Sequence, residues 1–310
     1  MMNNNHAHMH THHHGHTHSH VLLWPIVLVT GFAIVEAVGG WLSGSLALLG
    51  DAGHMFSDAA ALGLAAMGAW ISRRPASQQH SFGLMRAEVI VALVNGLLML
   101  LVIGAIVYEA IQRLQVPTPV RGAEVMVIAF IGFLVNVLVA WRLHHAEDNL
   151  NYRAAFLHVM GDLLGSVAAL VAGAVIYFTG WLPIDPILSL FICVLILFST
   201  LKLLAEALHV LMEGVPRHLN IDAVTAAMSA MPQVHEVHSV HIWALSSQVA
   251  ALSAHVVLED IQNWHEVLED LRQVLHERYD IDHVTLQPET IQALNSGEVD
   301  CWLTRRQSQA

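Results

Sequence analysis

The sequence predicts an α-helical membrane protein with six transmembrane helices and a C-terminal cytoplasmic α+β domain of ferredoxin-like type. Of its 310 residues, 55% are hydrophobic and only 12% are charged, whereas soluble domains carry roughly 25% charged residues. Six apolar stretches reach the roughly 20 residues that a helix needs to cross a bilayer. These observations exclude a soluble enzyme or a disordered protein. With 13 Lys and Arg against 25 Asp and Glu, the chain also lacks the basic face of a nucleic-acid binder.

The six apolar stretches form a transmembrane region over residues 21–211. We expect the spans at 21–42, 44–71, 87–111, 122–143, 153–178 and 184–209. Most of the loop arginines lie between spans 2 and 3 (Arg73, Arg74, Arg86) and between spans 4 and 5 (Arg142, Arg153). Cytoplasmic loops carry the excess of Lys and Arg, so these two loops and both chain termini are expected in the cytoplasm.

The composition changes near residue 212, where charged residues return and no further span follows. The pattern predicts a helix, two strands, an amphipathic helix and a last strand, at 220–231, 237–245, 249–258, 263–278 and 282–289. The order αββαβ is typical of a two-layer ferredoxin-like domain, which we expect over residues 212–290. Residues 291–310 have no periodic pattern and are predicted to be a disordered tail.

Two spans carry a histidine followed four residues later by an aspartate: His54 and Asp58 in span 2, His158 and Asp162 in span 5. Residues four apart share a helix face, so each span presents an imidazole and a carboxylate to one side. Two such faces would supply the four ligands of a tetrahedral Zn²⁺ site at membrane depth. Hydrogen bonds between helices, without a metal, are the alternative. The occurrence of the pair in two spans favours the metal site.

Other acidic and amide residues in the spans are interpreted as supporting groups. Asp51 can share the face of Asp58 and is expected to be a partner of the site or an entry ligand. Hydrogen bonds between helices are the expected role of four residues, Glu36, Asn95, Asn136 and Glu206. Hydration at the membrane interface is expected for four residues near span ends, Glu88, Glu109, Glu124 and Asp185.

Histidines outside the spans form two further groups. Nine of the 23 lie in residues 6–20, within a flexible cytoplasmic tail over residues 1–20 that is expected to collect metal weakly. An added tag is the alternative, but the Ala, Met, Thr, Gly and Ser residues between the histidines favour a native tract.

The predicted strands of the C-terminal domain carry the second group. In the last strand, Val284 and Leu286 alternate with His283 and Glu289, which places the latter pair on the face away from the core. His255 can lie on the matching face of the neighbouring strand. The first strand offers His238 or His241, and its pattern does not decide between them. Surface histidines are the alternative to a second metal site on this face.

Four sequence features together resemble the cation diffusion facilitator family, and within it the bacterial zinc exporters. They are the run from Gly40 to Asp58, the pair His158 and Asp162, the turn His80-Ser-Phe-Gly, and the strand Val-His238-Ser-Val-His241-Ile-Trp243. The resemblance covers about residues 20–290. It implies a homodimeric metal–proton antiporter in a bacterial inner membrane, a transporter and not an enzyme, with Zn²⁺ as cargo and Cd²⁺, Co²⁺, Ni²⁺ or Fe²⁺ as alternative cargo.

The resemblance also implies the roles of particular residues. His54, Asp58, His158 and Asp162 would hold the transported ion, and His238, His255, His283 and Glu289 would bind regulatory zinc, with His265 a lesser candidate. The chain departs from some relatives at three positions. Ser77 and Leu84 replace ligands of a further site around His80, and Gln287 replaces a ligating histidine.

Two other classes of protein fit the sequence less well. A membrane metalloenzyme would need an open metal position and a general base, yet the chain has no His-Glu-x-x-His and no Gly-x-Ser-x-Gly motif. A metal sensor without transport would not need six spans with a metal site between two of them. Metal flux driven by a proton gradient would separate these classes.

Overall fold

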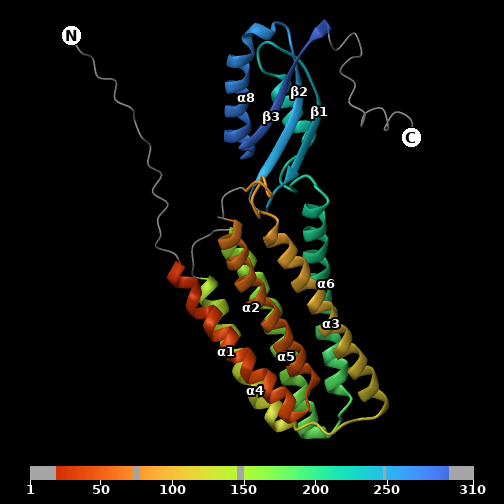
Figure 1. The fold of residues 1–310 in the computed structure, drawn as a ribbon. Coiled ribbons are helices and arrows are strands. Elements are labelled where there is room, and N and C mark those ends of the chain that lie inside the picture. Colours follow the sequence, from red (N-terminus) through yellow and green to blue (C-terminus); the bar gives the residue numbers. More distant parts are fainter. Residues whose placement is uncertain (1–18, 73–76, 145–149, 247–248, 293–310) are drawn as a thin grey trace, which may run out of the picture. The chain divides into compact units, whose positions relative to one another are not determined.

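The structure is a computed structural model that describes residues 19–72, 77–144, 150–246 and 249–292 (Figure 1). Each predicted span corresponds to one long helix, although span 2 was predicted to start two residues before its helix begins. The helices are α1 (Ser19–Ser43), α2 (Leu46–Ser72), α3 (Ala87–Gln115), α4 (Gly122–His144), α5 (Leu150–Thr179) and α6 (Ile184–Leu211). Four described segments, in α3, α4, α5 and α6, are long and apolar enough to cross a membrane, and Leu28–Ser43 of α1 is a shorter apolar helix. The helical membrane part of the prediction is confirmed.

The surfaces of these helices are apolar. Leu101 and Phe198 are each 71% exposed, and Trp41 is 76% exposed. Large exposed apolar patches are costly in water, so these side chains are suited to lipid or to contact with another protein surface.

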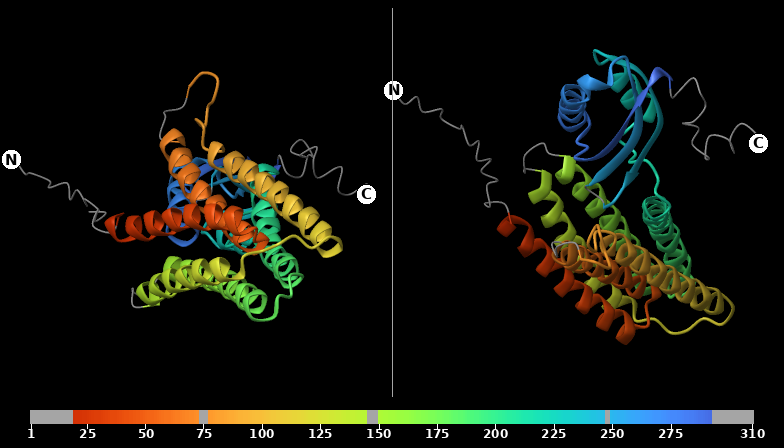
Figure 2. Two further views of the ribbon diagram at one scale, coloured as in Figure 1. Left: turned by 90° about the horizontal axis from the view of Figure 1, so that it is seen from below. Right: turned by 45° about the horizontal axis from the view of Figure 1, so that its top comes forward.

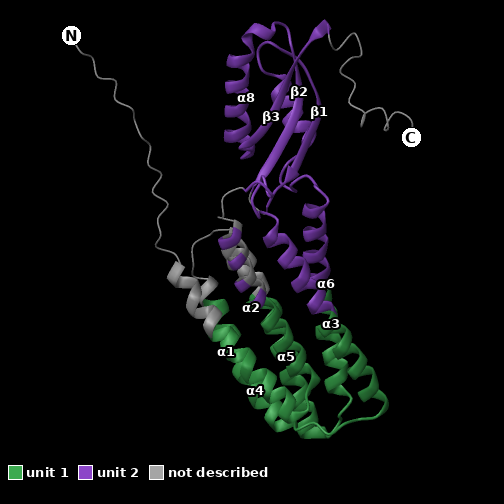
Figure 3. Cartoon of the chain, viewed as in Figure 1, with its two compact units in different colours: residues 1–59, 101–197 green, residues 60–100, 198–310 purple. Residues whose placement is uncertain are grey.

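The chain forms two compact units, which are described separately (Figure 3). The first combines residues 1–59 with residues 101–197, and the second combines residues 60–100 with residues 198–310. The first unit contains α1, α4, α5 and parts of α2, α3 and α6. The second contains the remaining parts of those three helices and the C-terminal α+β domain.

Within the first unit, α4 packs along α5 and also contacts α1, as the views of Figure 2 show. Glycines permit the close approach of α4 and α5. A Cβ atom on Gly122 would lie 2.7 Å from the amide nitrogen of Tyr177, and one on Gly173 would lie 2.6 Å from that of Met126. Small residues at such crossings let two backbones touch, which is how membrane helices gain packing energy.

Asp185, in the first turn of α6, caps the N-terminus of α2. Its Oδ1 accepts a hydrogen bond from the Ser45 hydroxyl at 2.6 Å, and its Oδ2 accepts one from the Leu46 amide at 2.8 Å. The residue is fully buried, so the expectation that it is hydrated at the interface is wrong. A carboxylate at a helix N-terminus satisfies unpaired amides and complements the helix dipole, which explains its burial.

The C-terminal domain has the predicted order αββαβ. Its elements are α7 (Ile221–Ser229), β1 (Val234–Ala244), β2 (Ala250–Leu258), the short 3₁₀ helix Ile261–Asn263, α8 (Trp264–Tyr279) and β3 (His283–Thr290). The sheet order is β1-β2-β3, with β1 and β2 antiparallel and β2 and β3 parallel.

The core of this domain lies between the sheet and the two helices. Leu252 and Val256 of β2 pack with Met228 of α7 and with Leu271 and Leu275 of α8, and all five are buried. Alternate residues of a strand point to opposite faces. The intervening residues of β2, among them His255, therefore lie on the other face of the sheet.

A β-bulge in β1 changes the side-chain alternation along that strand. Ser239 has a φ of 51°, and the pairing register shifts between His238, opposite His255, and His241, opposite Ser253. Val237 before the bulge and Val240 after it therefore both contact the core. Because a bulge inserts one residue, His238 and His241 share the face away from the helices. The strand pattern alone could not reveal this.

Candidate metal centres

The first candidate centre joins α2 to α5 within the first unit. Nδ1 of His54 lies 3.4 Å from Oδ2 of Asp58, and Nε2 of His54 lies 3.6 Å from Oδ1 of Asp162. Ligand atoms of the three residues all lie within 4.8 Å of one another. The exposed fractions of these side chains are 15% for His54, 32% for Asp58 and 6% for Asp162. The fold thus brings together three of the four predicted ligands.

The spacing of these atoms suits a small divalent ion. Zinc bonds of about 2.0–2.2 Å place neighbouring ligands of a tetrahedral site about 3.3 Å apart, close to both His54 distances. The imidazole lies between the two carboxylates, and each ring nitrogen faces one of them. A single ion binds one ring nitrogen, so one of these contacts would give way on metal binding.

The fourth predicted ligand, His158, lies one helical turn before Asp162 in α5. Its backbone is described, but its side chain lies outside the described part of the structure. The helix position is compatible with the predicted ligand set.

The structure agrees with some of the roles predicted for the supporting polar residues and not with others. Asn136 of α4 donates a hydrogen bond to Ser166 of α5 at 3.0 Å, which is a contact between helices as expected. Asp51 is 1% exposed and hydrogen-bonded to Ser166. Glu36 is fully buried, and neither of its carboxylate oxygens has a hydrogen-bond partner among the described residues. The expectation that Glu36 forms a hydrogen bond between helices is therefore wrong for the described structure.

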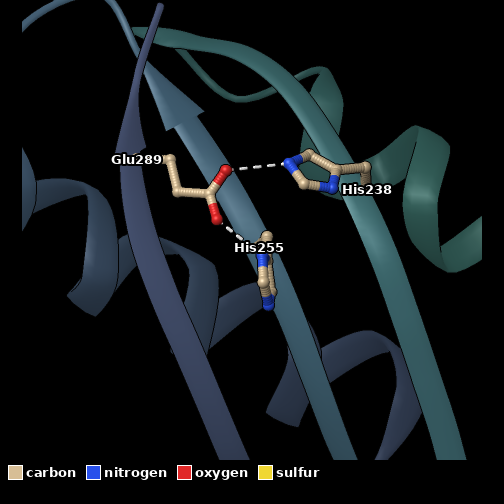
Figure 4. Close-up of side chains that lie close together, drawn as sticks. All are labelled: His238, His255 and Glu289. Atoms are coloured by element: carbon tan, nitrogen blue, oxygen red, sulfur yellow. Dashed lines mark hydrogen bonds and ion pairs between the residues drawn. The ribbon is translucent and has the colours of Figure 1, made fainter. Parts of the chain in front are cut away.

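The second candidate centre lies on the sheet face away from the helices of the C-terminal domain (Figure 4). Glu289 of β3 directs one carboxylate oxygen to each of two histidines. Its Oε2 lies 2.9 Å from Nε2 of His238, and its Oε1 lies 2.5 Å from Nδ1 of His255. Glu289 is 5% exposed. Two nitrogens and a carboxylate in mutual contact are ligands that zinc accepts.

The bulge at Ser239 positions the first of these histidines. Nε2 of His238 faces Glu289, and Nδ1 lies 3.3 Å from the Ser239 hydroxyl. A second contact of this kind fixes the tautomer and the orientation of a metal-binding imidazole. Between the two alternatives in β1, the structure thus groups His238, not His241, with Glu289.

The remaining candidates of the C-terminal domain lie apart from this group. His283, at the start of β3, pairs with Ala251, and its ring contacts Phe82 with centroids 5.2 Å apart. It is six residues before Glu289, or about 20 Å along an extended strand. Gln287 lies opposite His255 and donates to Glu289 Oε1 at 3.5 Å. His265 is exposed in the first turn of α8.

His80 lies in the loop before α3, within the second unit. The loop closes on itself, with the amide of Ser77 donating to the carbonyl of His80 at 3.0 Å. His80 lines a cavity of about 960 Å³ together with His241 and Trp243 of β1. Among the described residues, His80 belongs to no group of three metal-ligand side chains.

A third group of ligand-type residues was missed in the sequence. His276 lies in the last turn of α8, Asp280 caps the C-terminus of this helix, and Asp282 follows, with Nδ1 of His276 2.6 Å from Oδ1 of Asp282. All three are exposed. His276 and Asp280 repeat the four-residue spacing of the transmembrane pairs, which could have identified them. This group is exposed and includes the C-cap of α8, whereas the transmembrane group is partly buried and lies within helices.

Long apolar helices with a partly buried group of His and Asp side chains, followed by a small αββαβ domain, define a membrane protein that handles metal ions. Two family models match the chain: the cation efflux transmembrane domain over residues 22–212 and the cytoplasmic domain of cation efflux proteins over residues 216–291. The chain belongs to the cation efflux, or cation diffusion facilitator, family. Its members are metal-ion transporters and not enzymes.

Relatives match along most of the chain. The zinc transporter ZitB of Escherichia coli is 43% identical over 271 residues, which cover 86% of each chain. A cadmium, cobalt and zinc/H⁺–K⁺ antiporter of Bacillus subtilis is 38% identical over 275 residues, or 87% of this chain and 88% of the relative. A solved metal-bound C-terminal domain of the CzcD transporter from Cupriavidus metallidurans is 40% identical, covering 23% of this chain and 99% of that one, with a TM-score of 0.22.

Proposed function

We propose that the chain is a secondary active transporter that exports Zn²⁺ from the cytoplasm in exchange for protons. The transport site would consist of His54, Asp58, His158 and Asp162, between α2 and α5. The observation that carries this proposal is the group of His54, Asp58 and Asp162 at distances close to those of zinc ligands. The names of the relatives support zinc as cargo and also support Cd²⁺ and Co²⁺ as alternatives. Ni²⁺ and Fe²⁺ have ligand preferences that this site could also meet.

The His54 contacts offer a chemical basis for proton exchange. In its protonated form the ring carries a proton on each nitrogen, and each nitrogen faces a carboxylate. Only a neutral imidazole binds a metal, so zinc entry requires the loss of that extra proton. When the metal leaves, the freed ring nitrogen can take up a proton again, because the same imidazole is both a metal ligand and a base. Zinc and the proton therefore compete for His54.

The membrane potential sets the energy that exchange must supply. Export of one Zn²⁺ against an inside-negative potential costs roughly 4.6 kcal/mol per 100 mV, because each charge contributes about 2.3 kcal/mol. One entering proton returns half of this amount. A second proton, or a pH gradient, must provide the rest.

The transport site is tested in proteoliposomes by following zinc accumulation under an imposed pH gradient. Asp162→Ala and His54→Ala should each abolish accumulation, since each removes a ligand. Glu124→Gln, at the exposed start of α4 and outside the site, is the matched control and should transport as the wild type. Zinc movement against its gradient at the wild-type rate in either site variant would refute the assignment.

The cytoplasmic group His238, His255 and Glu289 is proposed to bind regulatory zinc, and His283 was expected with it from the family resemblance. Zinc there would hold β1, β2 and β3 together at one point of the sheet. His255→Ala should weaken zinc binding to this domain and leave transport measurable. His241→Ala, on the same sheet face but outside the group, is the control. Complete loss of transport by a folded His255→Ala variant would make this site essential instead.

The match to the family's cytoplasmic domain and the exposed apolar helix surfaces are consistent with a homodimer in a bacterial inner membrane. We propose that both termini lie in the cytoplasm, as the loop arginines predict. Labelling of single cysteines introduced near residue 2 and at residue 84, from either side of the membrane, tests this orientation. Labelling of these cysteines by a reagent added outside the membrane would show the opposite orientation.

A further inference from the structure

A second pair of buried carboxyl groups lies in the first unit and is not part of the metal group. Glu36 of α1 is fully buried, and Asp51 of α2 is 1% exposed. Both oxygens of Glu36 and Oδ2 of Asp51 have no hydrogen-bond partner among the described residues. Three buried carboxylate oxygens without a donor are costly, and acidic groups at membrane depth commonly have a functional role.

The surrounding helices enclose these carboxyl groups closely. A Cβ atom on Gly132 of α4 would lie 2.9 Å from Oε1 of Glu36, and one on Gly165 of α5 would lie 2.7 Å from Oδ1 of Asp51. Asp51 is hydrogen-bonded to Ser166, whose hydroxyl oxygen accepts from Asn136 at 3.0 Å. Because Ser166 has one proton to donate, it stabilises one oxygen of Asp51 and leaves the other available.

Among the described residues, the charged groups that act on this pair are acidic. Asp51 and Asp162 interact electrostatically with Glu36, and Asp162 and Asp58 interact with Asp51. Asp58 and Asp162 have His54 beside them, whereas Glu36 and Asp51 have no basic partner among their described contacts. Buried like charges cannot all remain ionised, so a proton is the simplest means of neutralising the pair.

We propose that Glu36 and Asp51 form a proton-binding pair that is separate from the metal ligands and carries a proton in the exchange cycle. This inference rests on the proposed zinc–proton exchange. Zinc arriving beside Asp162 would bring two positive charges near the pair and favour its ionised form, so the proton would leave. When zinc leaves, the pair takes a proton up again. Such linkage is reciprocal, so protonation of the pair also weakens zinc binding.

A proton fits this place better than a larger cation. Potassium or calcium would need many oxygen ligands, with six to eight typical for calcium, whereas three oxygens are available here. The contacts at Gly132 and Gly165 leave the carboxyl groups little freedom to rearrange around an ion. Potassium binding by the pair is one of the outcomes that the experiment distinguishes.

The test compares two assays on the full chain in proteoliposomes. Glu36→Gln keeps the side-chain volume but cannot carry the proton. Exchange of zinc for radioactive zinc at equal pH, which needs no net proton movement, should stay within twofold of the wild type. Zinc uptake driven by a pH gradient should fall at least tenfold. A pH-sensitive dye in weak buffer should also detect fewer protons released per zinc bound. Glu206→Gln in α6 is the control and should behave as the wild type.

Several results would overturn the proposal. One is gradient-driven uptake and proton release by Glu36→Gln at wild-type levels. Another is a folded variant that loses both zinc exchange and gradient-driven uptake, which would make Glu36 necessary for zinc occupancy. A third is uptake that requires a potassium gradient and is lost with Glu36→Gln, since this would assign potassium to the pair. If Glu36→Gln does not fold, Asp51→Asn is judged by the same criteria. A wild type insensitive to the pH gradient would instead refute the proposed function.

Discussion

Replacing Gly165 by alanine should disturb the transmembrane metal group from a neighbouring turn of α5. Gly165 lies three residues after Asp162, and its new Cβ atom would lie 2.7 Å from Oδ1 and 3.2 Å from Cγ of Asp51. Asp51 is buried and hydrogen-bonded to Ser166, so its carboxyl group cannot simply turn away. We therefore expect α2 and α5 to move apart locally.

The size of the effect follows from these distances. Relief of the 2.7 Å contact to an ordinary 3.4 Å requires a shift of about 0.7 Å. Metal sites tolerate distance errors of about 0.2 Å, so zinc binding should weaken roughly 10- to 100-fold, or about 1.4–2.7 kcal/mol. Overpacking should cost about 1–3 kcal/mol of stability, partly offset by about 0.5–1 kcal/mol from removing a helix glycine.

Gly161→Ala provides a matched control on the same helix. Gly161 immediately precedes Asp162, and among the described residues nothing outside its own turn of helix lies within 4 Å of an added Cβ. Zinc affinity and initial transport rates of both variants should be measured after reconstitution, together with thermal unfolding in detergent. Gly161→Ala should remain within twofold of the wild type. The reasoning fails if Gly165→Ala binds and transports zinc as well as Gly161→Ala does.

Three further changes test other parts of the structure. Asp185→Ala removes three hydrogen bonds at the start of α2 and should lower the stability of the full chain by about 3 kcal/mol or more. An unchanged unfolding temperature would contradict the capping role. Ser239→Gly should stabilise the C-terminal domain by about 1 kcal/mol, whereas Ser239→Val should destabilise it and weaken zinc binding, because only glycine adopts this left-handed backbone without strain. Glu289→Gln should weaken zinc binding at the cytoplasmic group at least tenfold, measured by competition with a chelating dye in an Asp162→Ala background; unchanged affinity would exclude Glu289 as a ligand.

Most of the fold is predictable from the sequence because its signals are local. The described apolar runs in α3, α4, α5 and α6 are each long enough to cross a membrane, and each predicted element of the C-terminal domain occurs in the expected order. The transmembrane pairs are also local, since a four-residue spacing on a helix places two side chains on one face. That spacing is not sufficient by itself, because exposed His276 and Asp280 have it as well.

Features that depend on contacts between distant segments could not be predicted. The position of Asp185 at a span end predicts a hydrated residue, but it is buried because the start of α2 offers it amide donors. The sequence predicts a hydrogen-bond partner for Glu36, but none lies among the residues that the structure describes. The residues next to Asp185 and Glu36 in the sequence do not indicate whether a distant helix supplies a hydrogen-bond donor.

The sequence by itself determined that the chain spans a membrane, that an αββαβ domain follows, and that His54 and Asp58 share a helix face. Hydropathy and helical periodicity decide these points within a few turns of chain. Only the tertiary structure decided that Asp162 of α5 lies beside His54, and that a bulge at Ser239 groups His238 with Glu289. Both depend on the packing and register of separate elements, where shifts of a few tenths of an ångström, or of one residue in a strand, change which ligands meet.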